Sequence, residues 1–335
     1  MARELYPLKF TPIYMERIWG GTLMREVLHR DVPEAGNPIG ESWEIVDRPG
    51  EQSVVANGEF AGMPFEELLR QYHGELLGPR GSSCKRFPLL VKLIDAGERL
   101  SLQVHPDENA CREIGGSAEP KTEMWYIISA LKTGKIMAGL SPRATRQQMM
   151  ETMDKPEVEN LLQVYQSQVG DAYFITSGTL HAIGEGNLIL EIQQNSDTTY
   201  RVSDWGRVDR NGKSRELHVE KGLKSINFTN RTSPRIAGVS GSAGHNRKFS
   251  MINRCPFFTV DELRLADVWH DDTAASGSFH LVSAINAPVR VGRSATAEEM
   301  VRLEPGETLL VPWSYGRYSI APENAGEAVV VRTTL

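Results

Sequence analysis

The sequence has few cysteines, no basic surplus and no long apolar run, and each absence excludes a class of protein. Its 335 residues include only three cysteines, Cys84, Cys111 and Cys255, which are far apart and form no CxxC pair. We therefore expect no disulfide framework and a reducing, cytoplasmic location. The net charge of -6 leaves no basic surplus to neutralise phosphates, so we expect no nucleic-acid partner.

No stretch of the chain approaches the roughly 18 consecutive apolar residues of a membrane helix. Residues 1–21 also lack the apolar segment of a signal peptide, so we expect no membrane partner. Hydrophobic residues make up 40% of the chain and charged residues 24%, as in globular proteins that bury sizeable cores. The length suggests about two domains.

Short apolar segments separated by turn residues predict a fold dominated by strands. Residues 87–96, 99–106 and 123–130 have the pattern of strands, and residues 63–78 have the spacing of a helix. Two stretches, "VGDAYFITSGTLHAI" and "PGETLLVPWSYGRYSI", share one plan: Gly and an acid, an apolar strand, a break and a polar strand. We therefore expect two cupin-like jelly-roll barrels, whose interiors are wide enough for a polar site.

The same patterns predict where the chain divides. We expect a catalytic cupin domain over 1–230, with an insertion of two helices at about 141–169 that is broken at Pro156. A Ser-, Gly- and Asn-rich linker at about 230–250 would precede a C-terminal cupin-like β domain over 245–335. The turn "GEGN" at 184–187 predicts a hairpin between its flanking strands.

The stretch "SLQVHPDE" places unusual polar residues next to a core strand. Side chains alternate between the faces of a strand, so Ser101, Gln103 and His105 share one face and Leu102 and Val104 share the other. The polar face either meets solvent or lines an enclosed polar space.

Further polar residues, Glu123 and His181, stand on other predicted strands. Imidazole and carboxylate are ligands that zinc and other divalent metals prefer, and the Gln103 amide could add a carbonyl oxygen. Each residue also has an ordinary interpretation, because histidines are often structural and a Lys–Glu pair such as Lys121 and Glu123 often lies on a solvated strand face.

Seven segments together carry a resemblance to a known family. They are "RIWGG", "GESWEI", "FPLLVKLIDA", "LSLQVHPDE", "KTEMWYII", "GTLHAIGEG" and "EIQQNSDTTYRVSDWGR". In this order, over about residues 5–225, the chain resembles class I mannose-6-phosphate isomerase in its shorter bacterial form. The resemblance implies an aldose–ketose isomerase that interconverts mannose 6-phosphate and fructose 6-phosphate through an enediol, as a monomer or small homo-oligomer acting on a sugar phosphate.

The resemblance also implies a ligand set. The family binds one zinc ion per chain through a Gln-x-His pair, a Glu and a distant His, which match Gln103, His105, Glu123 and His181. The chain departs from longer members in its short helical insertion and in Pro120, which stands where those members often have a histidine.

The remaining site residues follow in the same way. The resemblance implies Lys121, Glu191 and Arg201 as catalytic residues, with Glu191 preferred as the general base. Its further substrate-binding positions are matched by Trp19, Glu41, Lys92 and Ser101. For the phosphate, the sequence offers Lys92, Ser101 and Arg207 as anchors.

Two other functions use the same residues. Two His and one carboxylate on a jelly roll also describe a non-haem iron oxygenase, although Gln103 would fill a position that oxygen needs. A sugar-phosphate sensor without activity would have the same fold, but it would have no need of Lys121, Glu191 and Arg201.

Overall fold

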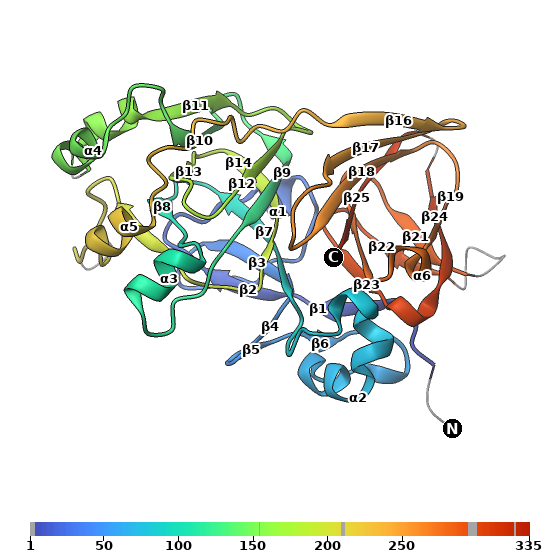
Figure 1. Cartoon of the computed structure of the whole chain (residues 1–335). Helices are drawn as coiled ribbons and strands as arrows, with labels where there is room; N and C mark the ends of the chain where they lie inside the picture. Colours follow the sequence, from blue (N-terminus) through green and yellow to red (C-terminus); the bar gives the residue numbers. More distant parts are fainter. Residues whose placement is uncertain (1–3, 154, 209–211, 294–299, 325) are drawn as a thin grey trace. The chain divides into compact units, whose positions relative to one another are not determined.

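The protein is dominated by strands, as the sequence predicts (Figure 1). The computed structural model describes residues 4–335 except 154, 209–211, 294–299 and 325. Two compact units divide the chain, and each is assembled from segments that are not contiguous. We call them the terminal unit (Met1–Ile13, Trp43–Val91 and Ala237–Leu335) and the central unit (Tyr14–Ser42 and Lys92–Ile236). The division into 1–230 and 245–335 stays a prediction, and the compact units interleave along the chain.

Two sheets form the terminal unit. The larger sheet has the order β16-β17-β18-β25-β20-β23-β1-β6 and the smaller has the order β19-β24-β21-β22. The strands of the larger sheet are β1 (Leu8–Thr11), β6 (Val54–Val55), β16 (Val239–Ala243), β17 (Asn246–Ile252), β18 (Thr259–Leu265), β20 (His280–Ala284), β23 (Thr308–Val311) and β25 (Ala328–Thr334). The smaller sheet contains β19 (Trp269–Asp272), β21 (Val289–Gly292), β22 (Val301–Leu303) and β24 (Arg317–Pro322). Both sheets contribute apolar residues to one buried core, as in a jelly roll.

Short elements complete the terminal unit. They are the pair β4 (Asp47–Arg48) and β5 (Glu51–Gln52), the helices α2 (Phe65–Leu77) and α6 (Thr273–Ser276), and the 3₁₀ turns η1 (Gly58–Phe60), η2 (Pro79–Gly81) and η5 (Trp313–Tyr315). Helix α2 confirms the helix predicted over 63–78.

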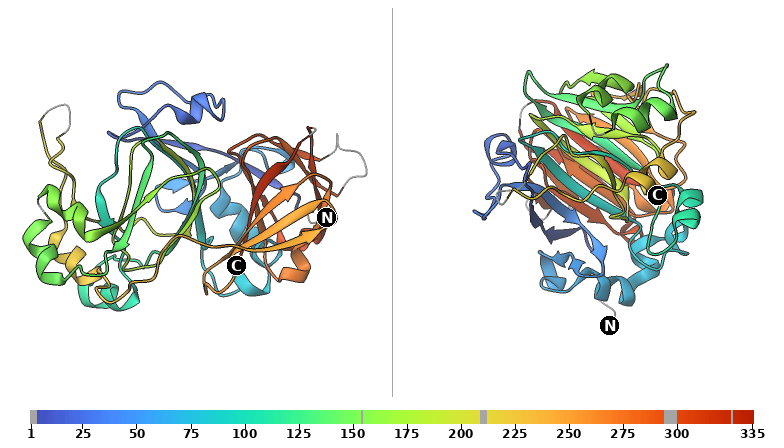
Figure 2. Two further views of the ribbon diagram at one scale, coloured as in Figure 1. Left: turned by 90° about the horizontal axis from the view of Figure 1, so that it is seen from above. Right: turned by 90° about the vertical axis from the view of Figure 1, so that its left-hand side faces the viewer.

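A second pair of sheets contains the strands of the central unit, with the orders β12-β9-β14-β7-β3-β2 and β11-β10-β13-β8-β15; the division between the units falls within β2, β3 and β7. The six-stranded sheet contains β2 (Ile13–Glu16), β3 (Ile39–Ile45), β7 (Leu89–Ala96), β9 (Glu123–Ala130), β12 (Ala172–Ile175) and β14 (Asn187–Gln194). The five-stranded sheet contains β8 (Leu102–Val104), β10 (Lys135–Leu140), β11 (Leu162–Gln166), β13 (His181–Ile183) and β15 (Tyr200–Ser203). Figure 2 shows these strands around a common interior, with β2 and β3 in blue and the others in cyan to yellow.

The alternation predicted for "SLQVHPDE" is confirmed. Leu102 and Val104 belong to an apolar cluster with residues of α4 (Arg146–Thr152), η3 (Pro156–Leu161) and the segment around α5 (Val219–Ser225), which cover the outer face of the five-stranded sheet. Ser101 and Gln103 instead line an interior pocket. The polar face of this strand therefore points into the barrel. The unit's other helices are α1 (Leu23–Glu26) and α3 (Glu108–Ile114).

The predicted hairpin at 184–187 is wrong. Strand β13 pairs with β10 and β8, whereas β14 pairs with β9 in the other sheet. The turn is thus a corner where the chain passes between sheets. The Asn187 side chain fastens it by donating to the carbonyl oxygens of Gly184 (2.8 Å) and Lys135 (3.1 Å), and Gly186 supplies a φ of +77°.

Two further predictions need correction. In the insertion, only α4 and the 3₁₀ turn η3 form, and residues 162–166 extend the five-stranded sheet as β11; Asp154 lies outside the described residues. In the predicted linker, residues 239–243 and 246–252 pair as the strands β16 and β17. Polar edge strands with Ser and Gly resemble loops in composition, because neither face carries a continuous apolar pattern.

The internal repeat has a structural counterpart. Its first copy gives β12 and β13, which lie in different sheets of the central unit, and its second copy gives β23 and β24, which lie in different sheets of the terminal unit. Both breaks are therefore sheet-to-sheet crossings. Aligning the copies places Arg317, an exposed residue, opposite His181. The fold is repeated without this histidine.

The structure also describes the cysteines and the length of the helices. Cys84, Cys111 and Cys255 are all free thiols. Among the described residues, no helix is long and apolar enough to cross a bilayer.

Two glycines give opposite predictions for stability. A Cβ at Gly40 in β3 would lie 2.6 Å from Arg17 Cβ and 2.7 Å from Trp19 Cζ3, whereas a Cβ at Gly74 in α2 would meet nothing within 4 Å. We expect Gly40→Ala to lower the free energy of unfolding by about 1–3 kcal/mol through overpacking. We expect Gly74→Ala to raise it by about 0.5–1 kcal/mol, because alanine is the better helix former. Urea unfolding followed by circular dichroism measures both, and equal effects of the two variants would contradict this account.

Candidate functional site

Three buried side chains converge inside the central unit. His105 follows β8, Glu123 opens β9 and His181 opens β13, and their ligand atoms all lie within 4.8 Å of one another. His105 Nε2 is 3.5 Å from Glu123 Oε2, and His181 Nε2 is 3.4 Å from Glu123 Oε1. The two sheets thus bring together residues that lie up to 76 positions apart in the chain, as their numbers show.

The backbone orients both imidazoles. His105 Nδ1 lies 2.8 Å from the carbonyl oxygen of Thr198, and His181 Nδ1 lies 2.8 Å from that of Thr179. A carbonyl only accepts, so each Nδ1 carries the hydrogen and each Nε2 keeps a lone pair. Among the described atoms, both Nε2 atoms and Glu123 Oε1 are buried without a hydrogen-bond partner. These three atoms have free lone pairs, which is what the ligands of a metal ion must offer.

The charge states of the cluster suit a cation. Burial lowers the pKa of both histidines, that of His181 to about 3, so both are neutral at pH 7. Burial alone raises the pKa of Glu123, but Lys121 and the histidines lower it well below its usual range. The cluster therefore offers two neutral nitrogens and one carboxylate.

Gln103 lies beside this cluster. It is the register partner of His181 across β8 and β13, and of Arg201 across β8 and β15. Opposite residues in neighbouring strands have Cβ atoms roughly 5 Å apart on one face. The Gln103 side chain also lines the pocket described next, so it lies between the cluster and the pocket.

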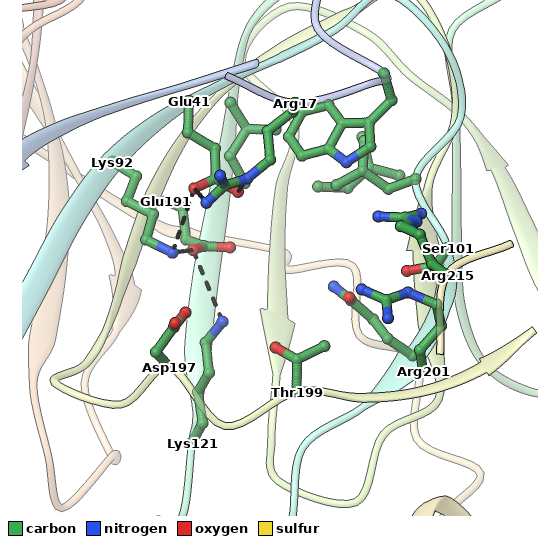
Figure 3. A pocket seen from close by; sticks show the side chains of 15 residues that line it. Arg17, Glu41, Lys92, Ser101, Lys121, Glu191, Asp197, Thr199, Arg201 and Arg215 are labelled. Carbon is green, nitrogen blue, oxygen red and sulfur yellow. Dashed lines mark hydrogen bonds and ion pairs between the residues drawn. The ribbon is translucent and has the colours of Figure 1, made fainter. Parts of the chain in front are cut away.

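A pocket of about 430 Å³ opens in the central unit (Figure 3). Its apolar lining, Ile94, Leu100 and Ile183 with Trp19, belongs to the buried core between the two sheets. The other residues that line it are polar: Arg17, Glu41, Lys92, Ser101, Gln103, Lys121, Glu191, Asp197, Thr199, Arg201 and Arg215. Its volume and polarity suit a small, highly polar ligand.

Glu191, on β14, lines one side of the pocket. Its Oε2 accepts a hydrogen bond from Trp125 Nε1 (2.9 Å), and its Oε1 lies 3.8 Å from Lys92 Nζ and 3.9 Å from Lys121 Nζ. Burial, followed by the charge of Glu123, raises the pKa of Glu191 to about 7. A carboxyl group with that pKa can accept and return a proton near neutral pH.

Lys121 connects the pocket to the His–Glu cluster. Its Nζ lies 2.8 Å from Glu123 Oε2 as well as 3.9 Å from Glu191 Oε1. Burial alone lowers the pKa of Lys121, but these two carboxylates raise it above its usual range, so Lys121 is a cation. Lys92 is also within 3.9 Å of Glu41, which Arg17 binds at 2.9 Å.

The opposite side of the pocket is basic. Figure 3 shows Arg201, Arg215 and Ser101 together, across the pocket from Lys121 and Glu191. The guanidinium of Arg201 donates to the carbonyl oxygen of Glu216 (2.9 Å), while its buried Nε has no hydrogen-bond partner among the described residues. The two guanidiniums lie close together in Figure 3, and burial, followed by the charge of Arg215, lowers the pKa of Arg201. Two adjacent guanidiniums and a hydroxyl form a site for an anion.

All eleven residues that the sequence analysis singled out for the site lie in this region. Three form the buried cluster, and eight line the pocket: Trp19, Glu41, Lys92, Ser101, Gln103, Lys121, Glu191 and Arg201. Arg207, considered for the phosphate, is not among the lining residues and binds Asp204 at 2.7 Å.

Sequence reasoning missed four polar lining residues. Asp197 and Thr199 stand four and two residues before Arg201, and Arg17 stands two before Trp19; these three lie just outside β15 and β2, so alternation continued past the strand ends could have suggested them. Arg215 gives no such signal, because it is not spaced by two residues from any predicted site residue and reaches the pocket through tertiary structure.

Comparison with known proteins identifies the family of this chain. Residues 7–122 match the family model described as "Phosphomannose isomerase type I, catalytic domain". The chain is 34% identical over 328 residues to mannose-6-phosphate isomerase ManA of Bacillus subtilis, covering 97% of this chain and 98% of that protein. It is 36% identical over 298 residues to mannose-6-phosphate isomerase of Streptococcus mutans, covering 89% of each.

The fold agrees as well. The crystal structure of the mannose 6-phosphate isomerase from Bacillus subtilis superposes with a TM-score of 0.86 at 30% identity, covering 99% of this chain and 100% of that one. The identity and the coverage extend along nearly the whole chain and confirm the resemblance found in the sequence. This chain therefore belongs to the type I phosphomannose isomerase family.

Proposed function

We propose that this protein interconverts mannose 6-phosphate and fructose 6-phosphate with one zinc ion bound per chain. The observation that carries the proposal is the pocket itself: a buried His–Glu cluster and an acid–base pair lie on one side, and a pair of arginines lies on the other. The isomerisation needs these parts, namely a polarising group, a base and an anchor for the phosphate.

Gln103, His105, Glu123 and His181 are the residues that would hold the zinc. Two neutral Nε2 atoms and a carboxylate match the ligands that zinc prefers, and the Gln103 amide oxygen can complete the set. When bound, a zinc ion supplies positive charge that polarises or orients the oxygens at C1 and C2 of the sugar.

Glu191 is the proposed general base. In the reaction a proton moves between C2 and C1 of the open-chain sugar, and a base near neutral pKa can carry it both ways. The hydrogen bond from Trp125 fixes one carboxylate oxygen, which leaves the other toward the pocket. Lys121 is positioned to donate a proton during ring opening, since its ammonium faces the pocket beside Glu191.

The basic side binds the rest of the substrate. Arg201 lies next to Gln103 in register, so we place it against the oxygen that becomes negative in the enediolate. The phosphate would then bind to Arg215 and the Ser101 hydroxyl, further along the same wall. Trp19, Glu41 and Lys92 would contact the sugar hydroxyls from the other walls.

The proposal predicts metal-dependent turnover. A coupled assay on mannose 6-phosphate should show activity in the purified protein, at least about a tenfold loss after chelation, and recovery when zinc is restored. Chelation would remove the zinc ion from His105, Glu123 and His181, and with it the positive charge that acts on the sugar oxygens. Metal content is measured in parallel by mass spectrometry. Absence of turnover in protein that verifiably contains zinc would contradict the isomerase assignment.

A second prediction concerns Glu191. We expect Glu191→Gln to lower kcat by about 10²–10⁴-fold with KM little changed, because the amide keeps the shape but accepts no proton. In the parent protein, the base must be ionised to act. A pKa raised to about 7 therefore predicts that kcat/KM rises with pH up to about pH 7 and falls as pH drops below it.

The matched control is Glu151→Gln on α4, where the carboxylate is exposed and accepts from Gln147 (2.9 Å). This variant should keep the parent kcat and the parent pH profile. If Glu191→Gln also retains the acidic limb of the profile with near-parent kcat, Glu191 is not the base.

A further inference from the structure

A single buried carboxylate, Asp204, organises the basic side of the pocket. Its side chain is 6% exposed and binds two arginines. Arg207 Nη2 donates to Oδ1 at 2.7 Å, while Arg215 donates through Nε to Oδ2 at 2.8 Å and through Nη2 to Oδ1. The two parallel bonds from Arg215 fix the plane of its guanidinium and leave Nη1 outside the pair.

The turn that contains Asp204 also forms hydrogen bonds to the backbone just before Ser101. Trp205 Nε1 donates to the carbonyl oxygen of Leu100 (2.7 Å), and Arg207 Nη1 donates to that of Arg99. Trp205 adopts a φ of +59°, a conformation that is unfavourable for a bulky residue and persists only where the surroundings impose it. Strain of this kind is common at ligand-binding sites.

The charges of this group match a phosphate. Arg201, Arg207 and Arg215 oppose one buried carboxylate, Asp204, so two positive charges remain. The nearby carboxylates of Glu98 and Glu216 are 64% and 83% exposed, so solvent screens them. A phosphate monoester carries roughly 1.5 to 2 negative charges near pH 7, which this surplus neutralises.

We propose that Asp204 is the positioning residue for the phosphate of the substrate: it aims Arg215 directly and, through Arg207, holds the segment that presents Ser101. This inference rests on the proposed function and deepens it. Asp204 does not line the pocket, so it acts through its neighbours and touches no substrate.

The test is Asp204→Asn in the zinc-loaded protein. The amide has the same size, but it lacks the charge and one of the two acceptor oxygens. We expect KM for mannose 6-phosphate to rise about 10- to 100-fold, the cost of losing a charged hydrogen bond, with kcat within about threefold of the parent. A KM within twofold of the parent would overturn the proposal, and so would a fall in kcat at constant KM.

A double-mutant cycle tests whether Asp204 works through Arg215. Arg215→Gln should raise KM by a similar factor, and the double variant should raise KM by clearly less than the product of the two single effects, because only the route through the Ser101 segment is left for Asp204 to lose. Fully additive effects would mean that Asp204 acts by another route. If Asp204→Asn does not fold, Asp204→Glu keeps the charge and displaces Arg215 by about one methylene, and it should raise KM about tenfold; a parent KM in that variant would overturn the proposal.

The matched control is Asp171→Asn. Asp171 also forms a carboxylate–arginine pair, with Arg235 at 2.6 Å, in which the carboxylate is partly buried and the arginine is exposed; neither residue lines the pocket. Its KM should stay at the parent value. The two levels of the proposal fail differently: a parent protein without turnover contradicts the isomerase function, whereas normal turnover in the parent and an unchanged KM in Asp204→Asn contradict only the role of Asp204.

Discussion

The arrangement of the site depends on one constraint: charges buried inside a barrel must lie beside charges of opposite sign. Removing an ion from water costs several kcal/mol even after relaxation, and only close partners offset it. Six side chains in the central unit satisfy this constraint as a series of alternating sign, with each neighbour within 3.9 Å. The series runs Arg17, Glu41, Lys92, Glu191, Lys121 and Glu123. Its last member belongs to the His–Glu cluster, so this cluster and the side of the pocket that carries Glu41, Lys92 and Glu191 form one electrostatic unit.

In the proposed reaction, this series would hold the charged groups of the pocket in place. Each charged group is held in place by its neighbours before a substrate arrives, which is the condition for electrostatic stabilisation of a transition state. Glu191, the proposed base, is the exception in this series. Although two lysines lie within 4 Å, burial keeps its pKa near neutrality, so it can exchange a proton while the others keep their charges. On the opposite side of the pocket, Asp204 is the buried carboxylate that binds Arg207 and Arg215.

Much of this could be predicted from the sequence, because strand periodicity is local. The alternation of Ser101, Gln103 and His105 with Leu102 and Val104 indicated a polar interior face, and the structure has that face. The turn at 184–187 shows the limit of local patterns. A tight Gly-rich turn fits either a hairpin or a corner between sheets, and only the pairing of β13 with β8 and β10 decides between them.

Residues whose positions depend on tertiary structure were harder to predict from the sequence. Arg215 lies outside the strands, and its place in the pocket depends on a buried carboxylate eleven residues earlier in the chain. The strand at 162–166 was missed for a related reason. Its pattern follows a helical segment without a clear break, and its strand conformation comes from pairing with β10 at the sheet edge. The order of the motifs predicted the candidate site residues. Asp204 and Arg215, which shape the basic side of the pocket, could be identified only from the three-dimensional structure.

The most direct test of the whole account is a crystal structure of the zinc-loaded protein with a non-reacting, open-chain analogue of the sugar phosphate, recorded with anomalous data at the zinc edge. The account predicts an anomalous peak about 2.0–2.2 Å from His105 Nε2, His181 Nε2 and a Glu123 oxygen, with the phosphate on Arg215 and Ser101 at the opposite wall. A phosphate bound instead at Lys92 and Arg17, or a zinc ion away from the His–Glu cluster, would contradict the orientation on which the proposed chemistry depends.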